Sequence, residues 1–137
     1  MPKEIKYSDK SKGQPELVIL FNEVKEIMRP FAKGHYEIHE DKPGNYGIYY
    51  NQEVEMFGKK YPELMLASLL IQKGYVGFYF FPVYVHEEMK KQLAPELLRT
   101  LKGKTCFHLK KSDPQLLKQI SQALRIGVDY FSSRGWK

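Results

Sequence analysis

The sequence predicts an α+β fold, a two-layer sandwich whose antiparallel five-stranded sheet carries the N- and C-terminal helices on one face. Residues 64–84 are mostly apolar at both strand parities, then aromatic and β-branched, as in two buried strands joined by a hairpin. Apolar residues recur at helical spacing near both ends of the chain, and strand patterns follow one another between them. Such an order of segments is typical of an antiparallel sheet with its helices on one side.

Length and composition favour one domain. A chain of 137 residues with 42% hydrophobic residues can form one core, and we expect a mobile lead-in over residues 1–13 before a single domain over 14–137. No run approaches the roughly 20 apolar residues of a membrane span, and the first residues are charged where a signal peptide is apolar. We therefore expect a cytoplasmic protein without a membrane partner. The single cysteine, Cys106, excludes an internal disulfide and a zinc site of several thiolates.

An amphipathic helix is predicted to begin at Pro15, because proline suits the first turn of a helix. Pro30 and Gly34 end it. Its apolar stripe consists of Leu17, Leu20, Phe21, Val24, Ile27, Met28 and Phe31. This stripe needs an apolar surface to cover, and the central strands supply one.

The pattern then changes to period two. From residue 35 to 40, Tyr36 and Ile38 alternate with polar residues, which predicts an outer strand with one wet face. A proline, a glycine and an asparagine predict a turn within residues 41–45, before a second strand at 46–51. One side of that second strand carries Tyr46, Ile48 and Tyr50.

The central hairpin follows a predicted loop at residues 52–63, where a glycine and a proline stand between charges. Its strands are predicted at 64–71 and 75–81. They are joined at Lys73-Gly74, where glycine can take the positive φ of a tight turn. A short apolar run is ambiguous by period, so a buried helix over 64–71 is the alternative.

After Pro82 the chain is predicted to form short helical segments, which Gly103 stops, and residues 105–110 alternate as the fifth strand. The clearest helix start is Asp113-Pro114, a carboxylate cap followed by proline at the first helical position. The apolar stripe of this last helix consists of Leu116, Leu117, Ile120, Leu124, Val128 and Phe131. The order of strands in the sheet is not determined.

Two residues near the C-terminus, Gly127 and Trp136, bear on the stability of the last helix and on the packing of the tail. Gly127 lowers the stability of the last helix by about 1 kcal/mol relative to alanine. Trp136 either packs back on the core or frays with the tail.

The positive charge belongs to the C-terminal part of the chain. The net charge is +6, but residues 88–137 hold eleven Lys and Arg against four Asp and Glu, whereas residues 1–87 hold eleven against twelve. Such a half can attract phosphates, nucleic acid or an acidic partner, and it can also be only a solvated surface.

Two short motifs resemble known sites and fail on their spacing. Gly103-Lys104-Thr105 would end a phosphate-binding loop, but the motif needs a glycine where Leu98 stands and a helix where a strand is predicted. His86-Glu87 would begin a zinc-protease helix, but the second histidine position holds Lys90. We therefore interpret Gly103-Lys104-Thr105 as a helix stop that leads into a strand. His86-Glu87 is not a zinc-protease motif.

Cys106 and His108 share one face of the fifth strand and suggest a thiol with its base. Residues two apart on a strand are separated by about 6.5–7 Å along its axis, too far for the hydrogen bond that would activate the thiol. We therefore expect a quiet, partly buried Cys106 and assign no catalytic residue.

His35, Glu37 and His39 share the predicted wet face of the first strand. Two imidazoles and a carboxylate could hold a divalent metal such as iron at modest affinity. Alternating polar residues on an exposed strand are a commoner pattern, and no cofactor is otherwise implied.

Tyrosines are the most informative residue type for function. The chain has ten, and those predicted on or beside the sheet are Tyr46, Tyr49, Tyr50, Tyr75, Tyr79 and Tyr84. If helices cover one face only, part of this set faces outward and can stack a planar ligand, seat a peptide or pair with a second subunit. The alternative is ordinary amphipathic core residues with their hydroxyls at the rim.

Two segments, ASLLIQKGYVGFYFFPVY and LLRTLKGKTCFHLKKSDPQLLKQI, resemble the YdhG-like family, a family of unknown function compared in fold to frataxin. The similarity covers about residues 15–131, and its most specific parts are 72–75, 82–84 and 103–107. The resemblance implies an α+β sandwich with terminal helices against an antiparallel sheet, and it transfers no catalytic residue.

Part of that family is labelled an iron chaperone, so the resemblance also implies iron delivery. Frataxin-like iron binding uses an acidic ridge around the first helix. In this chain the first helix carries Glu16, Glu23 and Glu26 together with Lys25 and Arg29, so its charge is mixed.

The preferred interpretation is a non-enzymatic binding domain that engages a small molecule or a protein partner through an aromatic sheet face. Its predicted ligand-binding residues are Tyr75, Tyr79, Tyr84, Lys73, Lys104 and His108. Iron delivery through His35, Glu37 and His39 is the second hypothesis, and nucleic-acid binding through the basic half is the third. Nucleic acid would require the aromatic residues and lysines to lie on one surface, which the sequence does not establish.

Overall fold

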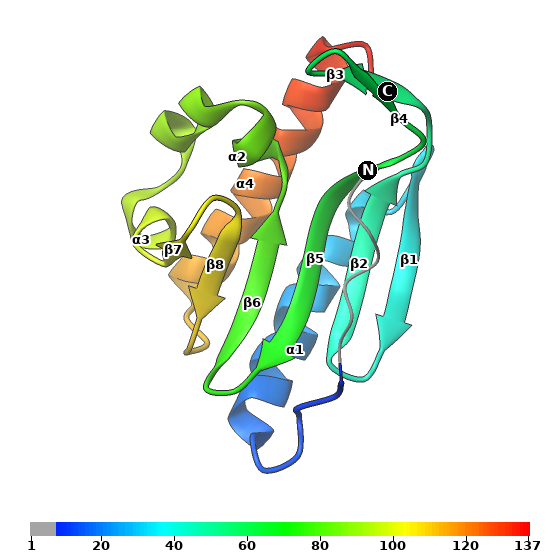
Figure 1. Ribbon diagram of the computed structural model, residues 1–137. Helices are drawn as coiled ribbons and strands as arrows, with labels where there is room; N and C mark the ends of the chain where they lie inside the picture. Colours follow the sequence, from blue (N-terminus) through cyan, green and yellow to red (C-terminus); the bar gives the residue numbers. More distant parts are fainter. Residues whose placement is uncertain (1–7) are drawn as a thin grey trace.

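The computed structural model describes residues 8–137 and confirms the α+β class (Figure 1). A sheet forms one layer, and two long helices, α1 (Pro15–Met28) and α4 (Pro114–Ser133), form the other. The strand order is β1-β2-β5-β6-β8-β7, and every neighbouring pair is antiparallel. The sheet has six strands, whereas the sequence predicted five.

The five predicted strands are all present, and the sixth is a short addition at the edge. The sheet strands are β1 (Tyr36–Lys42), β2 (Asn45–Tyr50), β5 (Leu64–Gln72), β6 (Tyr75–Phe80), β7 (Leu101–Lys102) and β8 (Cys106–Leu109). The two residues of β7 are too few to show a period, so β7 could not be predicted from the sequence. Since β5 is a strand, the alternative of a buried helix over 64–71 is wrong.

The predicted loop at 52–63 is also wrong in part, because it contains a second, two-stranded sheet of β3 (Val54–Met56) and β4 (Lys59–Tyr61). Val54 and Met56 are buried while the residue between them is exposed, an alternation too short to recognise by period. The connecting turn is Phe57-Gly58, and both residues have positive φ, 55° and 75°. Two positive φ values define the hairpin turn whose twist matches that of the flanking strands.

The short helices form an arm between β6 and β7. They are α2 (Pro82–Val85), the 3₁₀ helix η2 (Glu87–Gln92) and α3 (Pro95–Leu98), and a further 3₁₀ turn, η1 (Arg29–Phe31), extends α1. The buried side chain of Gln119 in α4 accepts from the Leu97 backbone N–H at 3.1 Å and donates to Glu96 at 2.7 Å. These bonds tie the arm to α4.

The C-terminal helix begins and packs as expected. The Asp113 carboxylate accepts from the Gln115 backbone N–H at 3.0 Å, which confirms the cap. A Cβ on Gly127 would lie 2.6 Å from Phe80 Cζ. The glycine is therefore needed for close approach of helix and sheet. Trp136 packs back, 8% exposed, with its ring edge-on to Phe131 at 5.2 Å.

Residues 8–14 lie against the turn between β5 and β6. Lys10 Nζ donates to Gln72 Oε1 at 3.1 Å. The Gln14 side-chain amide donates to the Gln72 carbonyl at 3.0 Å and accepts from the Gly74 N–H at 2.8 Å. Residues 1–7 of the predicted lead-in lie outside the described residues.

The difference in burial between the two faces of the sheet is clearest along β6. Val76, Phe78 and Phe80 are fully buried in the core that α1 and α4 share with the sheet. Tyr75 and Tyr79 alternate with them and are only partly buried. Because successive side chains of a strand point to opposite faces, these two tyrosines lie on the side away from the helices.

Candidate functional site

The candidate site is the outward side of β6 and β8, here called the aromatic face and defined by Tyr75, Tyr79, Cys106 and His108. On β8, Phe107 and Leu109 are buried in the core, so Cys106 and His108 share the opposite side with the two tyrosines. The pairing of β6 with β8 places Tyr79 opposite Cys106 and Gly77 opposite His108. Two segments separated in sequence by the helical arm therefore form one surface.

Gly77 determines how Tyr79 lies on this face. A Cβ at Gly77 would be 2.9 Å from Tyr79 Cε1 and 3.4 Å from its Cζ, so the ring occupies the space above the glycine. Any larger residue at position 77 would force the ring to move. The ring therefore lies along the sheet and is held in place on it.

Tyr75 and His108 form a stacked pair at one end of the aromatic face. Their ring centroids are 3.8 Å apart and their planes differ by 8°. Burial, with the nearby charges of Lys102 and Lys110, lowers the pKa of His108. The imidazole is therefore neutral at pH 7, since its ordinary pKa is already about 6.5. A neutral ring both stacks and offers one donor and one acceptor.

Cys106 and Tyr79 form a hydrogen-bonded pair whose members both keep their protons. Burial raises the pKa of the Cys106 thiol, and burial is also the main reason that the pKa of Tyr79 rises to about 12. A thiol acts as a nucleophile through its thiolate, which a raised pKa disfavours. The expected quiet, partly buried cysteine agrees with these shifts.

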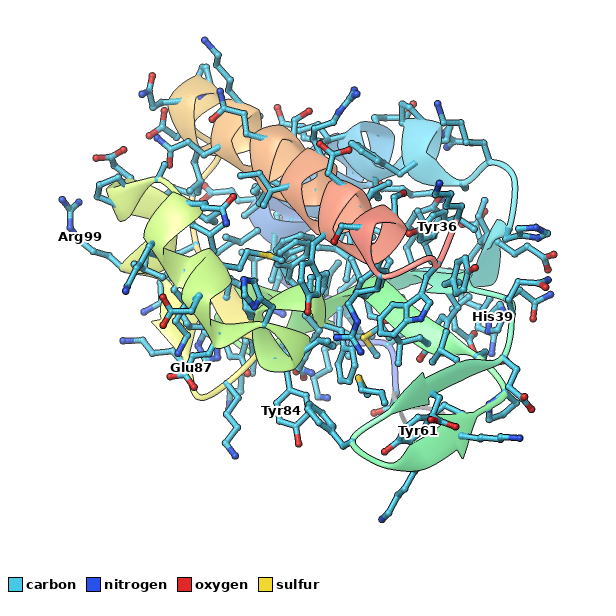
Figure 2. The ribbon with its side chains drawn as sticks, turned by 90° about the horizontal axis from the view of Figure 1, so that it is seen from above. Tyr36, His39, Tyr61, Tyr84, Glu87 and Arg99 are labelled. Atoms are coloured by element: carbon cyan, nitrogen blue, oxygen red, sulfur yellow. The ribbon has the colours of Figure 1, made fainter. Side chains whose placement is uncertain are left out.

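Beyond the end of β6, a cluster of rings continues the aromatic face; it is called the aromatic end and consists of Phe57, Phe81 and Tyr84. Tyr84 in α2 contacts the other two, with centroids 5.3 Å from Phe81 and 6.1 Å from Phe57. Lys104 Nζ lies 5.7 Å from the Tyr84 ring centroid, within reach of a cation–π contact. Figure 2 shows Tyr84 on the side of the molecule away from α4, near the hairpin that carries Tyr61.

Phe57 is the most exposed ring of the aromatic end. It is 62% exposed, and Tyr84 is 43% exposed. Phe57 is also the only non-glycine residue with positive φ among residues 8–137. A bulky side chain in this conformation is strained, and such strain is commonly found at functional sites.

The structure places the six predicted ligand-binding residues in two groups. Tyr75, Tyr79 and His108 belong to the aromatic face, with Lys73 exposed in the turn beside Tyr75. Tyr84 and Lys104 belong to the aromatic end. The residues missed by sequence reasoning are Phe57, Phe81 and Lys102. The positive φ of Phe57 had one sequence signal, the glycine that follows it, as in a two-residue hairpin turn.

Not all tyrosines predicted on the sheet face outward. Tyr36, Tyr46 and Tyr50 are buried in the core beneath the helices. The hydroxyls of Tyr36 and Tyr46 have no hydrogen-bond partner among the described residues, and burial raises the pKa of both. These tyrosines contribute to packing, as the alternative interpretation expected, but the hydroxyls of Tyr36 and Tyr46 are buried and do not lie at the rim.

His35, Glu37 and His39 are not gathered into a metal site. The pairing of β1 with β2 shifts at a bulge between Ile38 and Glu40, which disturbs the alternation at His39. His39 Nδ1 lies 3.2 Å from Glu63 Oε2, and the ring of His35 is edge-on to Tyr50 at 6.2 Å. Within residues 8–137 no group of three or more His, Cys, Asp or Glu side chains could hold a metal ion.

The carboxylates around α1 are interleaved with cations. Glu26 pairs with Arg29 at 2.7 Å. Asp41 on β1 pairs with Lys25 at 2.6 Å. This region therefore carries mixed charge and does not form a continuous acidic ridge.

Two cavities lie away from the aromatic face. One of about 390 Å³ lies between α1 and the turn of β1 and β2, and its lining includes the Lys25–Asp41 ion pair. Another of about 540 Å³ lies against α4, where Gln122 and Arg125 line it. Both are alternative places for a ligand.

Comparisons with protein-family models, curated proteins and solved structures found no match to this chain. None of the helices within residues 8–137 has the length and apolar character needed to cross a membrane.

Proposed function

We propose that this protein is a non-enzymatic binding module whose small-molecule ligand or protein partner contacts the aromatic face and the aromatic end. The observation that carries the proposal is two groups of rings that are at least partly exposed, Tyr75 and Tyr79 on β6 and Phe81, Tyr84 and Phe57 beyond its end. Aromatic rings provide large contact areas at little cost in side-chain entropy, and grouped exposure of such rings is typical of interaction surfaces.

The titrating groups of the aromatic face support binding over catalysis. The thiol of Cys106 and the hydroxyl of Tyr79 keep their protons at neutral pH, because burial raises both pKa values. The imidazole of His108 is engaged in a stack with Tyr75. Neutral donors and acceptors beside rings suit recognition of a planar molecule with polar edges.

We also propose that the chain is a YdhG-like domain and that it is located in the cytoplasm. The sandwich with two terminal helices on one face is the fold that the resemblance to the YdhG-like family implies. The single cysteine, which forms no disulfide, supports a cytoplasmic location.

A planar anion tests the proposal without knowledge of the natural ligand. Anilinonaphthalene sulfonate added to isotope-labelled protein should shift the amide signals of β6, β8 and α2. Tyr79→Leu should weaken this binding by removing the central ring, and Lys118→Gln, an exposed lysine on α4, should leave it unchanged. Shifts confined to residues lining the α1 or α4 cavity would reject the proposal, as would a Tyr79→Leu variant that is folded and binds normally.

A further inference from the structure

The two hairpins that form the aromatic face contain positive charges and no negative ones. Residues 64–86 and 97–112 include no Asp or Glu. Their cationic residues are Lys73, Arg99, Lys102, Lys104, Lys110 and Lys111. The pairing of β6 with β8 brings these two stretches together.

Lysines are distributed along the whole aromatic face. Lys102 on the edge strand β7 is paired with Cys106. The charges of Lys102 and Lys110 both lower the pKa of His108, so both ammonium groups lie near its ring. Lys104 stands at the aromatic end, over Tyr84. A linear anion lying along β6 and past its end would therefore meet Lys102 and Lys110 at the aromatic face and Lys104 at the aromatic end.

The rings are spaced for a chain with repeated planar groups. Tyr75 and Tyr79 are four residues apart on β6, which corresponds to about 13 Å. The Tyr79 ring lies along the sheet above Gly77, and the Tyr75–His108 stack precedes it. The aromatic end then follows through Phe81 and Tyr84. The Tyr79 ring, the Tyr75–His108 stack and the rings of the aromatic end therefore provide separate stacking positions near the lysines.

We infer that the aromatic face binds a single-stranded nucleic acid, in place of the small molecule or protein partner named above; the inference rests on the proposed role of this face as a binding surface. Proteins that bind single strands combine lysines for the phosphates with aromatic rings on which successive bases stack. A duplex hides its base faces and would use only the lysines, and so would an acidic peptide. The rings, with the neutral polar groups of Gln72, Tyr79 and His108 beside them, favour unpaired bases.

Fluorescence anisotropy with labelled oligothymidylate of about 12 nucleotides tests the inference. Three lysine–phosphate contacts predict a slope of about −2 for log affinity against log salt, since each contact with a single strand contributes roughly −0.7. Affinity should thus fall about 20-fold between 50 and 200 mM salt. Lys102→Gln should make the slope shallower by about 0.7, and Lys118→Gln on α4 should not change it.

The stacking contribution is tested by a matched pair of variants at position 79. Tyr79→Leu should weaken binding roughly 5- to 150-fold, the loss expected for one stacked base. Tyr79→Phe keeps the ring and should retain most of the affinity. Circular dichroism of each variant checks that it is folded. A Leu variant that binds as well as the Phe variant would overturn the inference.

Further outcomes separate the partner classes. Absence of oligothymidylate binding at 50 mM salt, or equal binding of a duplex of the same length, would overturn the inference. So would binding to anionic lipid vesicles or polyglutamate without oligothymidylate binding. If the aromatic face still binds anilinonaphthalene sulfonate in those cases, only the nucleic-acid inference fails. If the dye shifts no residue of this face, the proposed function fails with it.

Discussion

The two faces of the sheet differ in what their side chains contact, although they alternate along the same strands. On the helix side of β6, three consecutive inward residues are fully buried against α1 and α4. On the other side, Tyr75 and Tyr79 contact a thiol, an imidazole and a glycine and keep part of their surface exposed. One strand thus divides its residues between stability and recognition, because the two sets point to opposite faces.

The largest expected effect is on the free energy of unfolding, and it compares Phe78 on the core side of β6 with its neighbour Tyr79 on the outer side. Phe78→Ala should lower the free energy of unfolding by about 3–5 kcal/mol, because it leaves a cavity between sheet and helices. Tyr79→Phe should lower it by only about 0.5–1.5 kcal/mol, the usual contribution of one hydrogen bond. Urea unfolding followed by circular dichroism measures both. Equal losses would show that the outer face is as structural as the core.

A smaller effect is expected at the aromatic end, where strain and exposure coincide. Phe57 has φ of 55°, a conformation that costs a residue with a side chain about 1–2 kcal/mol. Asparagine tolerates it, and Asn-Gly is a favoured sequence for this turn. Phe57→Asn should therefore leave stability unchanged or raise it by up to about 1 kcal/mol, although the contact with Tyr84 is lost.

Phe57→Tyr is the control in the same urea experiment, because it keeps both the ring and the strained backbone. Its stability should equal that of the unmodified protein. A Phe57→Asn variant less stable than Phe57→Tyr would show that Phe57 is kept for packing, and the aromatic end would lose one of its arguments for recognition.

The last prediction concerns ionisation on the outer face. Burial raises the pKa of Tyr79 to about 12, so the folded protein holds this proton where an unfolded tyrosine, with a pKa of about 10, has released it. The stabilisation is fully present below pH 10 and is lost as the pH rises through 12.

Phenolate absorbance measures this shift as the difference between the unmodified protein and Tyr79→Phe. The difference should develop near pH 12 in the native protein and near pH 10 in urea. A native difference that develops at pH 10 would mean that the ring is solvated and does not lie against the sheet.

Much of the fold could be predicted from local patterns. The apolar runs at 64–71 and 75–81 and the cap at Asp113 each gave the correct element, because period and capping chemistry are local properties. The short strands β3, β4 and β7 were missed, since two or three residues do not establish a period. The bulge before Glu40 was missed because a shift in pairing depends on the partner strand.

The candidate site was predictable by residue type and not by arrangement. Tyr75, Tyr79 and His108 were expected to face outward together, and pairing of β6 with β8 brings them onto one face. Tyr84 was expected in the same surface, yet it contacts Phe57, a residue in a predicted loop. Such contacts join segments that share no local pattern, so only the folded chain brings them together.

The sandwich class, the two terminal helices and the central hairpin follow from the order of residues alone, because hydrophobic period and turn chemistry act over a few residues. Which lysines meet which rings depends on the pairing of β8 with β6 across the helical arm, so it follows only from the folded chain. Gly127 shows the same division. Its local effect on the helix is unfavourable, and its benefit appears only where Phe80 packs against it.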